Sequence, residues 1–307
     1  MTANPRDQGV PGDASAPTVA VVVASLGRPE LIGQVQAAME RQTAPPDFLL
    51  FSVTGPGDLP PGFEESARVH AIRSRKGLCA QRNAALDYLR GRFDLIAFYD
   101  DDFVPSRSSI ANIRAFFAAH PGVAGATGRV IADGIRSSGI TLQQAEALLE
   151  QDDARDFHPN CIVAATHGLY GCNMVYRTSA IGSQLFDERL RLYAWQEDVD
   201  FAASLRSKGR IVRTFAFAGV HQGVKSGRTS GLRLGYSQVI NPCYLVRKGT
   251  LPWPTAVNLI LRNLLANHVK LACPEPWVDR AGRARGNWIG LADLVRGRLT
   301  PERIEAL

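Results

Sequence analysis

Three short, largely apolar runs constrain the fold of this chain more than any other feature. They cover residues 18–24, 48–53 and 94–99. Runs of this length, rich in β-branched and aromatic side chains and followed by polar or turn residues, are typical of strands that are buried on both faces. Helical patterns lie between them, at 30–41 and 77–90. This alternation predicts an α/β fold, with a mainly parallel central sheet and helices on both of its faces.

The same alternation continues as far as residue 221. Further strands are predicted near 69–72, 123–128, 169–176 and 211–215, and further helices at 107–119 and 197–207. Residues 133–160 are polar and irregular apart from a helical pattern at 142–150. We interpret this stretch as a variable region that covers a binding site.

Length and composition fit one large folded domain with appended segments. The chain has 307 residues, of which 45% are hydrophobic and 21% charged, and this is enough to bury a full core. Residues 1–17 contain no apolar stretch, so we expect a disordered lead-in without a secretory signal. We expect residues 18–250 to form the α/β domain and residues 251–307 to form an amphipathic, basic helical extension.

The cysteine pattern indicates the cellular compartment. The five cysteines are odd in number, widely spaced and without a Cys-x-x-Cys pair. This pattern fits reduced thiols better than a disulfide framework or a zinc site. We therefore expect a cytoplasmic protein.

Charge is divided unevenly along the chain, whose net charge is +6. After Asp200 there are 17 Lys and Arg against 5 Asp and Glu, whereas 18 stand against 24 up to that point. The basic part suits an anionic partner such as a diphosphate substrate or anionic lipid, and the acidic part suits a metal ion. Nucleic acid is the weakest option, because no aromatic-interleaved basic stripe accompanies the charge.

Residues 254–273 combine apolar and polar residues in a helical pattern, and the polar ones argue against a membrane span. The apolar face holds Val257, Ile260, Leu261, Leu264, Leu265 and Leu271. Two roles stay open for this helix: packing against the core, which is the commoner fate, or peripheral contact with a membrane. Nearby arginines and tryptophans favour anionic headgroups. They are Arg280, Arg283, Arg285, Arg296, Arg298, Trp277 and Trp288.

The third apolar run ends in three consecutive carboxylates, Asp100, Asp101 and Asp102. Adjacent anions repel one another unless a cation or solvent compensates them. Open α/β sheets bind ligands at the carboxyl ends of their strands, and hard oxygen ligands there suit Mg²⁺ or Mn²⁺. An acidic turn or a helix cap is the simpler explanation for an isolated aspartate pair. The triplet therefore needs a partner motif.

Two later features supply that partner. Glu197, Asp198 and Asp200 open a predicted helix, and His221 follows the last predicted strand. Each has a plain structural explanation, because a helix dipole favours acids in its first turn and a histidine after a strand is often a hydrogen-bonded structural residue. The order of the three features along the chain carries more weight than any one of them.

In this order the motifs resemble those of family 2 glycosyltransferases, which have the glycosyltransferase-A (Rossmann-like) fold. The resemblance runs from about Val19 to His221. Residues 21–30 resemble the first strand and nucleotide loop, and residues 76–83 resemble a Gly-x-x-x-x-Arg-Asn helix start. Residues 100–105 resemble the Asp-x-Asp motif with its trailing proline. Residues 171–173, 177, 186–188 and 197–200 resemble the acceptor-side block.

The resemblance implies an inverting, metal-dependent hexosyltransferase of polysaccharide biosynthesis. Such an enzyme moves a sugar from a nucleotide-diphosphate donor to a hydroxyl of a saccharide or lipid-linked acceptor. Asp102 and His221 would hold the Mg²⁺ or Mn²⁺ that neutralises the diphosphate leaving group, and Asp100 would lie at the ribose. Asp198 would be the base that deprotonates the acceptor.

The resemblance implies roles for other residues too. Donor contacts are expected from Ser25, Arg28, Glu30, Ser52, Arg82, Asp100 and Asp101, and acceptor contacts from Asn173, Trp195 and Glu197. Arg82 has an alternative structural role, in which it pairs with an aspartate and anchors its helix. Glu197 or Asp200 would raise the pKa of Asp198. Lys225 and Arg228 lie in a Gly-flanked loop that either closes over the diphosphate or is a plain surface loop.

One departure from the family concerns the base of the donor. The family usually has an aspartate pair after the second strand, whereas this chain has Ser52 and Val53 followed by Thr54 and Gly55. This difference leaves GDP-, dTDP- and other nucleotide donors open beside uridine. Ser52 or Thr54 remains able to contact a base.

Two other functions compete with glycosyl transfer. A sugar-nucleotide nucleotidyltransferase shares a parallel sheet and metal-binding aspartates, but its Gly-rich phosphate loop is missing after the first strand, where residues 25–29 supply a single glycine. A non-catalytic saccharide-binding protein has no need of two acidic clusters and a histidine. Both are disfavoured relative to the transferase.

Overall fold

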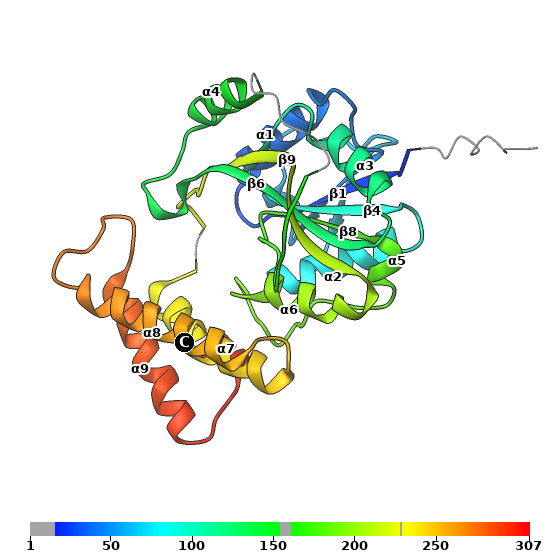
Figure 1. Cartoon of the computed structure of the whole chain (residues 1–307). Helices are drawn as coiled ribbons and strands as arrows, with labels where there is room; N and C mark the ends of the chain where they lie inside the picture. Colours follow the sequence, from blue (N-terminus) through cyan, green and yellow to red (C-terminus); the bar gives the residue numbers. More distant parts are fainter. Residues whose placement is uncertain (1–15, 154–160, 228) are drawn as a thin grey trace, which may run out of the picture.

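The computed structural model describes residues 16–153, 161–227 and 229–307. Most of the predicted lead-in lies outside these ranges, as do residues 154–160 of the predicted variable region and Arg228 of the predicted donor loop. Figure 1 shows an α/β body and a group of three helices, α7 to α9, gathered beside it.

One sheet of nine strands forms the body, in the order β3-β2-β1-β4-β8-β6-β9-β5, with β7 paired to β9. The strands are β1 Val19–Ala24, β2 Phe48–Val53, β3 Val69–Arg73, β4 Leu95–Asp100, β5 Phe103–Pro105, β6 Val123–Asp133, β7 Ile162–Ala165, β8 Asn173–Arg177 and β9 Arg210–His221. Strands β3, β2, β1 and β4 are parallel to one another. Beyond them the sheet is mixed, because β8 runs antiparallel to both β4 and β6.

The helices are α1 Pro29–Glu40, α2 Leu78–Leu89, α3 Ser109–Ala119, α4 Leu142–Asp153, α5 Thr178–Ile181, α6 Glu197–Ser204, α7 Gly231–Lys248, α8 Trp253–Val269 and α9 Arg280–Val295. Of these, α1 and α3 cover one face of the sheet and α2 covers the other (Figure 1). The predicted α/β class, with helices on both faces and a C-terminal helical segment, is confirmed.

The alternating side chains of β1 explain why an uninterrupted apolar run forms a strand here. Val19, Val21 and Val23 point into the core on the side of α1 and α3. Ala20 and Val22 point into the opposite core, against α2. Burial of each valine stabilises the fold by about 1.5–3 kcal/mol, so both faces of the sheet hold the strand in register.

The predicted elements agree with the structure best where apolar runs are complete. β6 and β9 extend well beyond the predicted 123–128 and 211–215. The added residues of β6 are mostly half-buried, whereas those of β9 are mostly buried. The short strands β5 and β7 and the long helix α7 were not predicted. Helix α7 contains Gly235 and the internal Pro242, both of which are unfavourable in an isolated helix. Packing against α9 and the body overrides that preference.

Glycines let α7 and α9 approach closely. A Cβ atom at Gly286 would collide with the carbonyl oxygen of Leu232, and one at Gly235 would collide with that of Arg283. The amide of Asn287 also donates a hydrogen bond of 2.8 Å to the Gly235 carbonyl. The small residues therefore fix the spacing of the two helices.

Helix α7 is also tied to the body by polar contacts. Lys248 Nζ lies 2.7 Å from carboxylate oxygens of both Asp187 and Asp200, and Thr250 donates a hydrogen bond of 2.7 Å to Asp200. Asp200 belongs to α6, so these contacts hold α6 in place. Within the described residues, no helix has the length and apolar content needed to cross a membrane.

We predict that Gly286→Ala destabilises the protein by about 1–3 kcal/mol, because the added methyl overpacks the α7–α9 contact. Gly33→Ala is the matched control. Gly33 lies in α1, and a Cβ atom added there would meet no heavy atom within 4 Å, so this change should stabilise by about 0.5–1 kcal/mol through the unfolded state. Urea unfolding of both variants measures the difference. Equal effects of the two changes would show that the glycine contact carries no packing constraint.

Candidate active site

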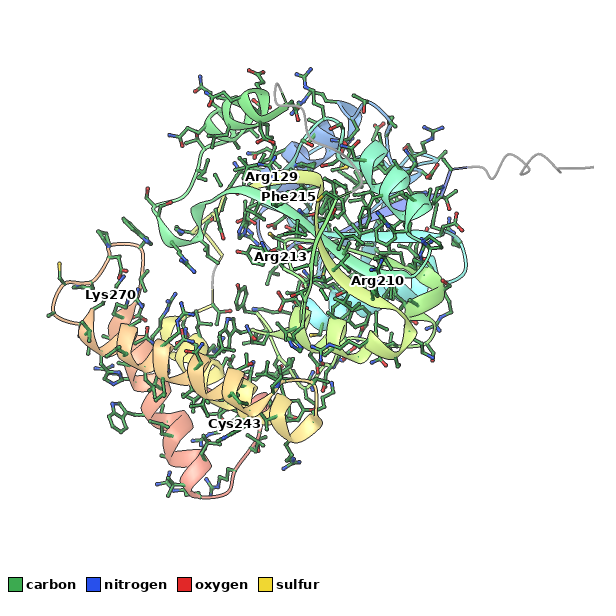
Figure 2. The ribbon with its side chains drawn as sticks, viewed as in Figure 1. Arg129, Arg210, Arg213, Phe215, Cys243 and Lys270 are labelled. Carbon is green, nitrogen blue, oxygen red and sulfur yellow. The ribbon has the colours of Figure 1, made fainter. Side chains whose placement is uncertain are left out.

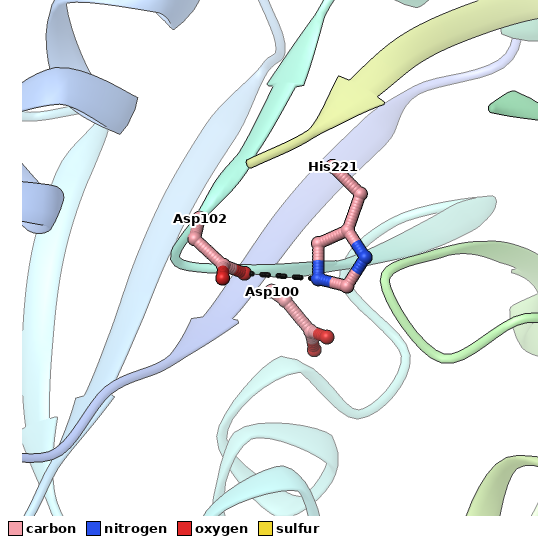
Figure 3. A group of neighbouring side chains, drawn as sticks. All are labelled: Asp100, Asp102 and His221. Carbon is pink, nitrogen blue, oxygen red and sulfur yellow. Dashed lines mark ion pairs between the residues drawn. The ribbon is translucent and has the colours of Figure 1, made fainter. Parts of the chain in front are cut away.

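Strand pairing brings Asp100, Asp102 and His221 together. Asp100 ends β4, Asp102 lies in the turn before β5, and His221 ends β9. β5 and β9 pair antiparallel with Phe103 opposite His221, which places the histidine beside the turn. Nε2 of His221 is 3.3 Å from Oδ1 of Asp102. Figure 3 shows the Asp100 carboxylate turned towards the same space.

This group fits a divalent cation. One ligand atom from each of the three residues lies within 4.8 Å of the others. Two carboxylates and one imidazole are a donor set that Mn²⁺ and Mg²⁺ accept, with Mn²⁺ better suited to the imidazole. Asp102 and His221 are buried, while Asp100 is half-buried. The predicted ligands Asp102 and His221 are thus together, and Asp100 joins them as a third candidate ligand.

Two residues that the sequence analysis missed orient His221. Asp133, which ends β6, accepts a hydrogen bond of 2.9 Å from Nδ1 of His221. The hydroxyl of Tyr170 donates a hydrogen bond of 2.7 Å to the other oxygen of Asp133. A carboxylate on Nδ1 fixes the tautomer that leaves Nε2 for a metal, as outer partners of metal-binding histidines commonly do. No sequence signal marked Asp133, because it lies far from the acidic motifs.

The carboxylates around His221 favour its protonated form, and a cation at this site would replace the proton on Nε2. Burial lowers the pKa of His221, but the hydrogen bonds to Asp102 and Asp133 outweigh it and raise the pKa to about 10. The same contact with His221 lowers the pKa of Asp102 in spite of its burial. Asp102 also accepts a hydrogen bond of 2.8 Å from the backbone N–H of Val224. The carboxylate is therefore held in its ionised form.

Asp101 faces away from this group. Its carboxylate accepts a hydrogen bond of 2.6 Å from Ser25 and lies 2.8 Å from the guanidinium of Arg28. Burial raises the pKa of Asp101 to about 7 against the opposing effect of Arg28. Asp101 therefore connects the end of β4 to the loop after β1, and three of the predicted donor-side residues are in contact with one another.

Arg82 is a buried cation of the site, with 2% of its surface exposed. Its guanidinium lies 2.5 Å from Glu197 and 3.2 Å from Asp100. It also donates a hydrogen bond of 3.1 Å to the carbonyl of Gly171. Both predicted roles of Arg82 involved one partner, whereas the structure gives it three, on β4, on α6 and in the loop before β8.

Asp198 lies next to this cation at the start of α6. Its oxygens accept hydrogen bonds of 2.9 Å from the N–H of Gly171 and 2.8 Å from its neighbour Val199. Burial is the largest cause that raises the pKa of Asp198, and Asp100 adds to it. The predicted direction of the shift is confirmed, but its cause is different. Glu197 and Asp200, which were expected to cause it, are neutralised by Arg82 and Lys248.

The loop before α6 has an unusual backbone. Leu192, Ala194 and Gln196 have φ values of 59°, 54° and 76°, in the left-handed region that non-glycine residues seldom adopt. The carbonyl of Trp195, between two of them, accepts a hydrogen bond of 2.8 Å from Asn241 on α7. Such strain often accompanies functional loops, and here it shapes the segment that contains the predicted acceptor residue Trp195.

Other predicted residues occupy different environments. Ser52 is buried and its hydroxyl lies 3.2 Å from that of Ser74. Glu30 is exposed in the first turn of α1. Asn173 is buried, and its amide has no hydrogen-bond partner among the described residues. Lys225 donates hydrogen bonds to the carbonyls of Gly134 and Ile135, at 2.8 and 3.1 Å. Their ligand-binding roles stay predictions.

A cavity of about 370 Å³ lies beside Tyr170, between β6, β9 and the loop before β8. Its walls include Arg129, Arg213 and Phe215, which Figure 2 labels along the long strands. The guanidinium of Arg129 lies over the Phe215 ring, 6.0 Å from its centre. The volume falls in the range of small-ligand pockets.

Comparisons with known proteins bear on this site. Residues 59–183 match the model of the family described as Glycosyl transferase family 2. The matched segment contains the aspartate triplet and ends before Asp198 and His221. No curated protein matches the sequence.

Several solved structures are similar in fold. The mannosyltransferase PcManGT from Pyrobaculum calidifontis, in complex with GDP-Man and Mn²⁺, has 15% identity and a TM-score of 0.53, over 94% of this chain and 89% of that chain. TarS 1-349 of S. aureus, in complex with UDP-GlcNAc, has 14% identity and a TM-score of 0.53, over 94% and 83%. GalNAc-T7 with UDP, GalNAc and Mn²⁺ has 12% identity and a TM-score of 0.52, over 94% and 60%. The predicted glycosyltransferase-A fold is confirmed.

We predict that Asp133→Asn weakens Mn²⁺ binding by about 10- to 100-fold, because the neutral amide no longer polarises His221. Asparagine retains an oxygen that can accept the hydrogen bond that Asp133 receives from the N–H of Ile135, so the fold should persist. Isothermal titration with Mn²⁺ measures the change. Asp87→Asn, an exposed change on α2, is the control. Unchanged Mn²⁺ affinity in Asp133→Asn would refute the orienting role.

Proposed function

We propose that this chain is a family 2 glycosyltransferase that moves a sugar from a nucleotide-diphosphate donor to a hydroxyl of a saccharide or lipid-linked acceptor. The family match over residues 59–183 and the fold support this proposal. The observation that carries the proposal is the arrangement around Arg82. The Arg82 guanidinium contacts Asp100, which belongs to the candidate metal-binding group with Asp102 and His221. It also contacts Glu197, which precedes Asp198 in the sequence. A charge-neutralising group and a candidate base therefore belong to the same site.

Donor binding is assigned to the carboxyl end of β4. Asp102 and His221, with Asp100 beside them, would hold Mg²⁺ or Mn²⁺. When bound, such a cation neutralises the negative charge that develops on the departing diphosphate. Arg28 is fixed by Asp101 at the loop after β1, where its charge would attract a phosphate. Because Ser52 and Val53 stand where the family usually has an aspartate pair, the identity of the nucleotide base stays open.

Acceptor activation is assigned to Asp198. One proton must leave the attacking hydroxyl, and an ionised carboxylate with a raised pKa accepts it more readily than an ordinary aspartate does. The two backbone hydrogen bonds orient Asp198 and leave lone pairs on both oxygens for the acceptor. Attack from the face opposite the leaving group inverts the anomeric carbon. The cavity beside Tyr170 and the loop around Trp195 are the candidate acceptor space.

The finer assignments extend this proposal. Transfer of a hexose and a role in polysaccharide biosynthesis follow from the resemblance of the acceptor-side block to the family. Mn²⁺ and nucleotide sugars occur in the complexes of similar fold, with GDP-Man in PcManGT and UDP-GlcNAc in TarS 1-349. Those ligands belong to those proteins, and they define the donors to screen first with this chain.

We predict that Asp198→Asn lowers turnover by about 10²- to 10⁴-fold while donor affinity stays unchanged, because only the base is lost. The donor is selected by a thermal-shift screen of UDP, GDP and dTDP sugars with Mn²⁺. Release of nucleoside diphosphate measures turnover, and Asp87→Asn is again the control. Turnover that survives in Asp198→Asn would exclude Asp198 as the base, and pyrophosphate release from NTP and sugar phosphate would identify a nucleotidyltransferase instead.

The pH profile provides a further readout in the same assay. Asp198 must be ionised to accept a proton, and its pKa is raised. The rate should therefore fall as the pH drops, and the midpoint of this fall should lie above the ordinary range of an aspartate. A midpoint inside or below that range would contradict the assignment.

A further inference from the structure

Exposed apolar side chains are concentrated on the C-terminal helices. Large apolar residues that are at least one-third exposed number eleven in the described ranges, and eight of them lie between residues 253 and 295. They are Trp253, Leu261, Leu265, Val269, Leu271, Trp277, Trp288 and Val295. Monomeric proteins seldom expose apolar groups so closely gathered without a partner.

Four of these residues, Leu261, Leu265, Val269 and Trp288, define a surface that we call the α8–α9 face. Leu261, Leu265 and Val269 follow one another at intervals of four in α8, so they form one stripe. Leu261 and Leu265 are 58% and 66% exposed. The ring of His268, one turn beyond Leu264, meets the Trp288 ring of α9 at 5.8 Å between centres. Trp288, which is 62% exposed, therefore continues the stripe onto α9.

The charge on this face is positive. Arg262 is adjacent to Leu261, and Arg285 precedes Trp288 by three residues on α9, which puts it on the same side of that helix. Both arginines are exposed, and neither forms an ion pair with any other described residue. Lys270, labelled in Figure 2 just beyond α8, is by contrast paired with Glu275 and adds no unpaired charge to the stripe.

The acids of the same segment do not offset these arginines. Five Asp and Glu occur after Asp200, and each is engaged inside the chain. Glu275 pairs with Arg280 at 2.8 Å, Asp279 caps α9, Asp293 pairs with Arg303, Glu302 pairs with Arg189, and Glu305 lies 4.0 Å from Arg191. The exposed charge that remains on the α8–α9 face is therefore basic.

We propose that the α8–α9 face docks on an anionic lipid bilayer, with the leucines and tryptophans in the headgroup region and the arginines on lipid phosphates. An apolar stripe flanked by arginine and exposed tryptophan is the composition of interfacial helices. A second copy of the chain fits less well. A two-fold dimer through this face would set Arg262 and Arg285 against their own counterparts, so like charges would meet.

The site of docking suits a peripheral attachment. No helix in the described part of the chain is long and apolar enough to span a bilayer. The proposal does not depend on catalysis, since the face lies on α8 and α9 and the candidate active site lies at the ends of β4 and β9. If the proposed transferase activity is also correct, docking would bring the site to a lipid-linked acceptor.

Vesicle co-sedimentation of the full chain tests the proposal. We expect binding to vesicles of equimolar phosphatidylcholine and phosphatidylglycerol, and much weaker binding to phosphatidylcholine alone or at high salt. Leu261→Gln with Leu265→Gln should weaken binding by about tenfold, and Arg262→Gln with Arg285→Gln should do the same. All four residues are exposed, so folding should be unaffected, and circular dichroism checks this.

Matched control variants distinguish binding through the α8–α9 face from nonspecific hydrophobic or electrostatic binding elsewhere on the protein. Leu185→Gln removes an apolar group that is 39% exposed on the body, and Arg68→Gln with Lys76→Gln removes two exposed charges there. Both should bind vesicles like the unchanged protein. Equal losses in the controls, or no sedimentation of the unchanged protein with anionic vesicles, would refute the proposal. Light scattering measures the oligomeric state. A dimer of the unchanged protein that becomes monomeric in the variant Leu261→Gln with Leu265→Gln would identify a second copy of the chain as the occupant of the face.

Discussion

Arg82 places one buried positive charge between Asp100 on β4 and Glu197 on α6. A guanidinium in the interior is tolerated only when carboxylates and hydrogen-bond acceptors surround it, because the desolvation penalty is several kcal/mol per ion. The carbonyl of Gly171 supplies the remaining acceptor, and the N–H of the same residue holds Asp198. The position of the candidate base therefore depends on the same cation that holds the metal-side aspartate.

The surroundings reinforce this connection from the opposite side. Lys248 and Thr250 bind Asp200, so α6 is fixed both at its first turn by Arg82 and further along by α7. The rings of Phe98 and Phe186 lie 5.7 and 5.5 Å from the Arg82 guanidinium carbon, which adds cation–π contacts to the ion pairs. The C-terminal helices thus contribute to the geometry of the site, although none of their residues belongs to it.

The elements that could be predicted were those with a local signature. The apolar run ending at Tyr99 specified β4, and the aspartates after it marked the ligand end of the sheet. Asp133, by contrast, reaches His221 only because β6 and β9 pair side by side, and no local pattern reports such a pairing. Pro242 concealed α7 for the opposite reason, since local preference opposed a helix that tertiary contacts stabilise.

The chemical roles of the site residues were predicted better than the identity of the residues that they contact. Asp102 and His221 were expected to meet from the family resemblance, and they do, because β5 pairs with the end of β9. The cause of the raised pKa of Asp198 was wrong, since an acidic cluster in sequence does not reveal which of its members are paired. Similarly, the amphipathic pattern of residues 254–273 left core packing and surface exposure open, and the exposure of Leu261 and Leu265 favours the second.

The claim that one buried cation unites both acidic groups is tested most directly by a double-mutant cycle on Arg82 and Glu197. The free energies of unfolding of Arg82→Met, Glu197→Gln and the double variant are measured in urea. We expect each single change to cost about 3–5 kcal/mol, because Arg82→Met removes the cation that pairs with buried Glu197 and Glu197→Gln removes one of the carboxylates that compensate buried Arg82. The double variant should cost well below the sum. Single effects that add within about 0.5 kcal/mol would contradict the account, since they would show that the two residues do not interact.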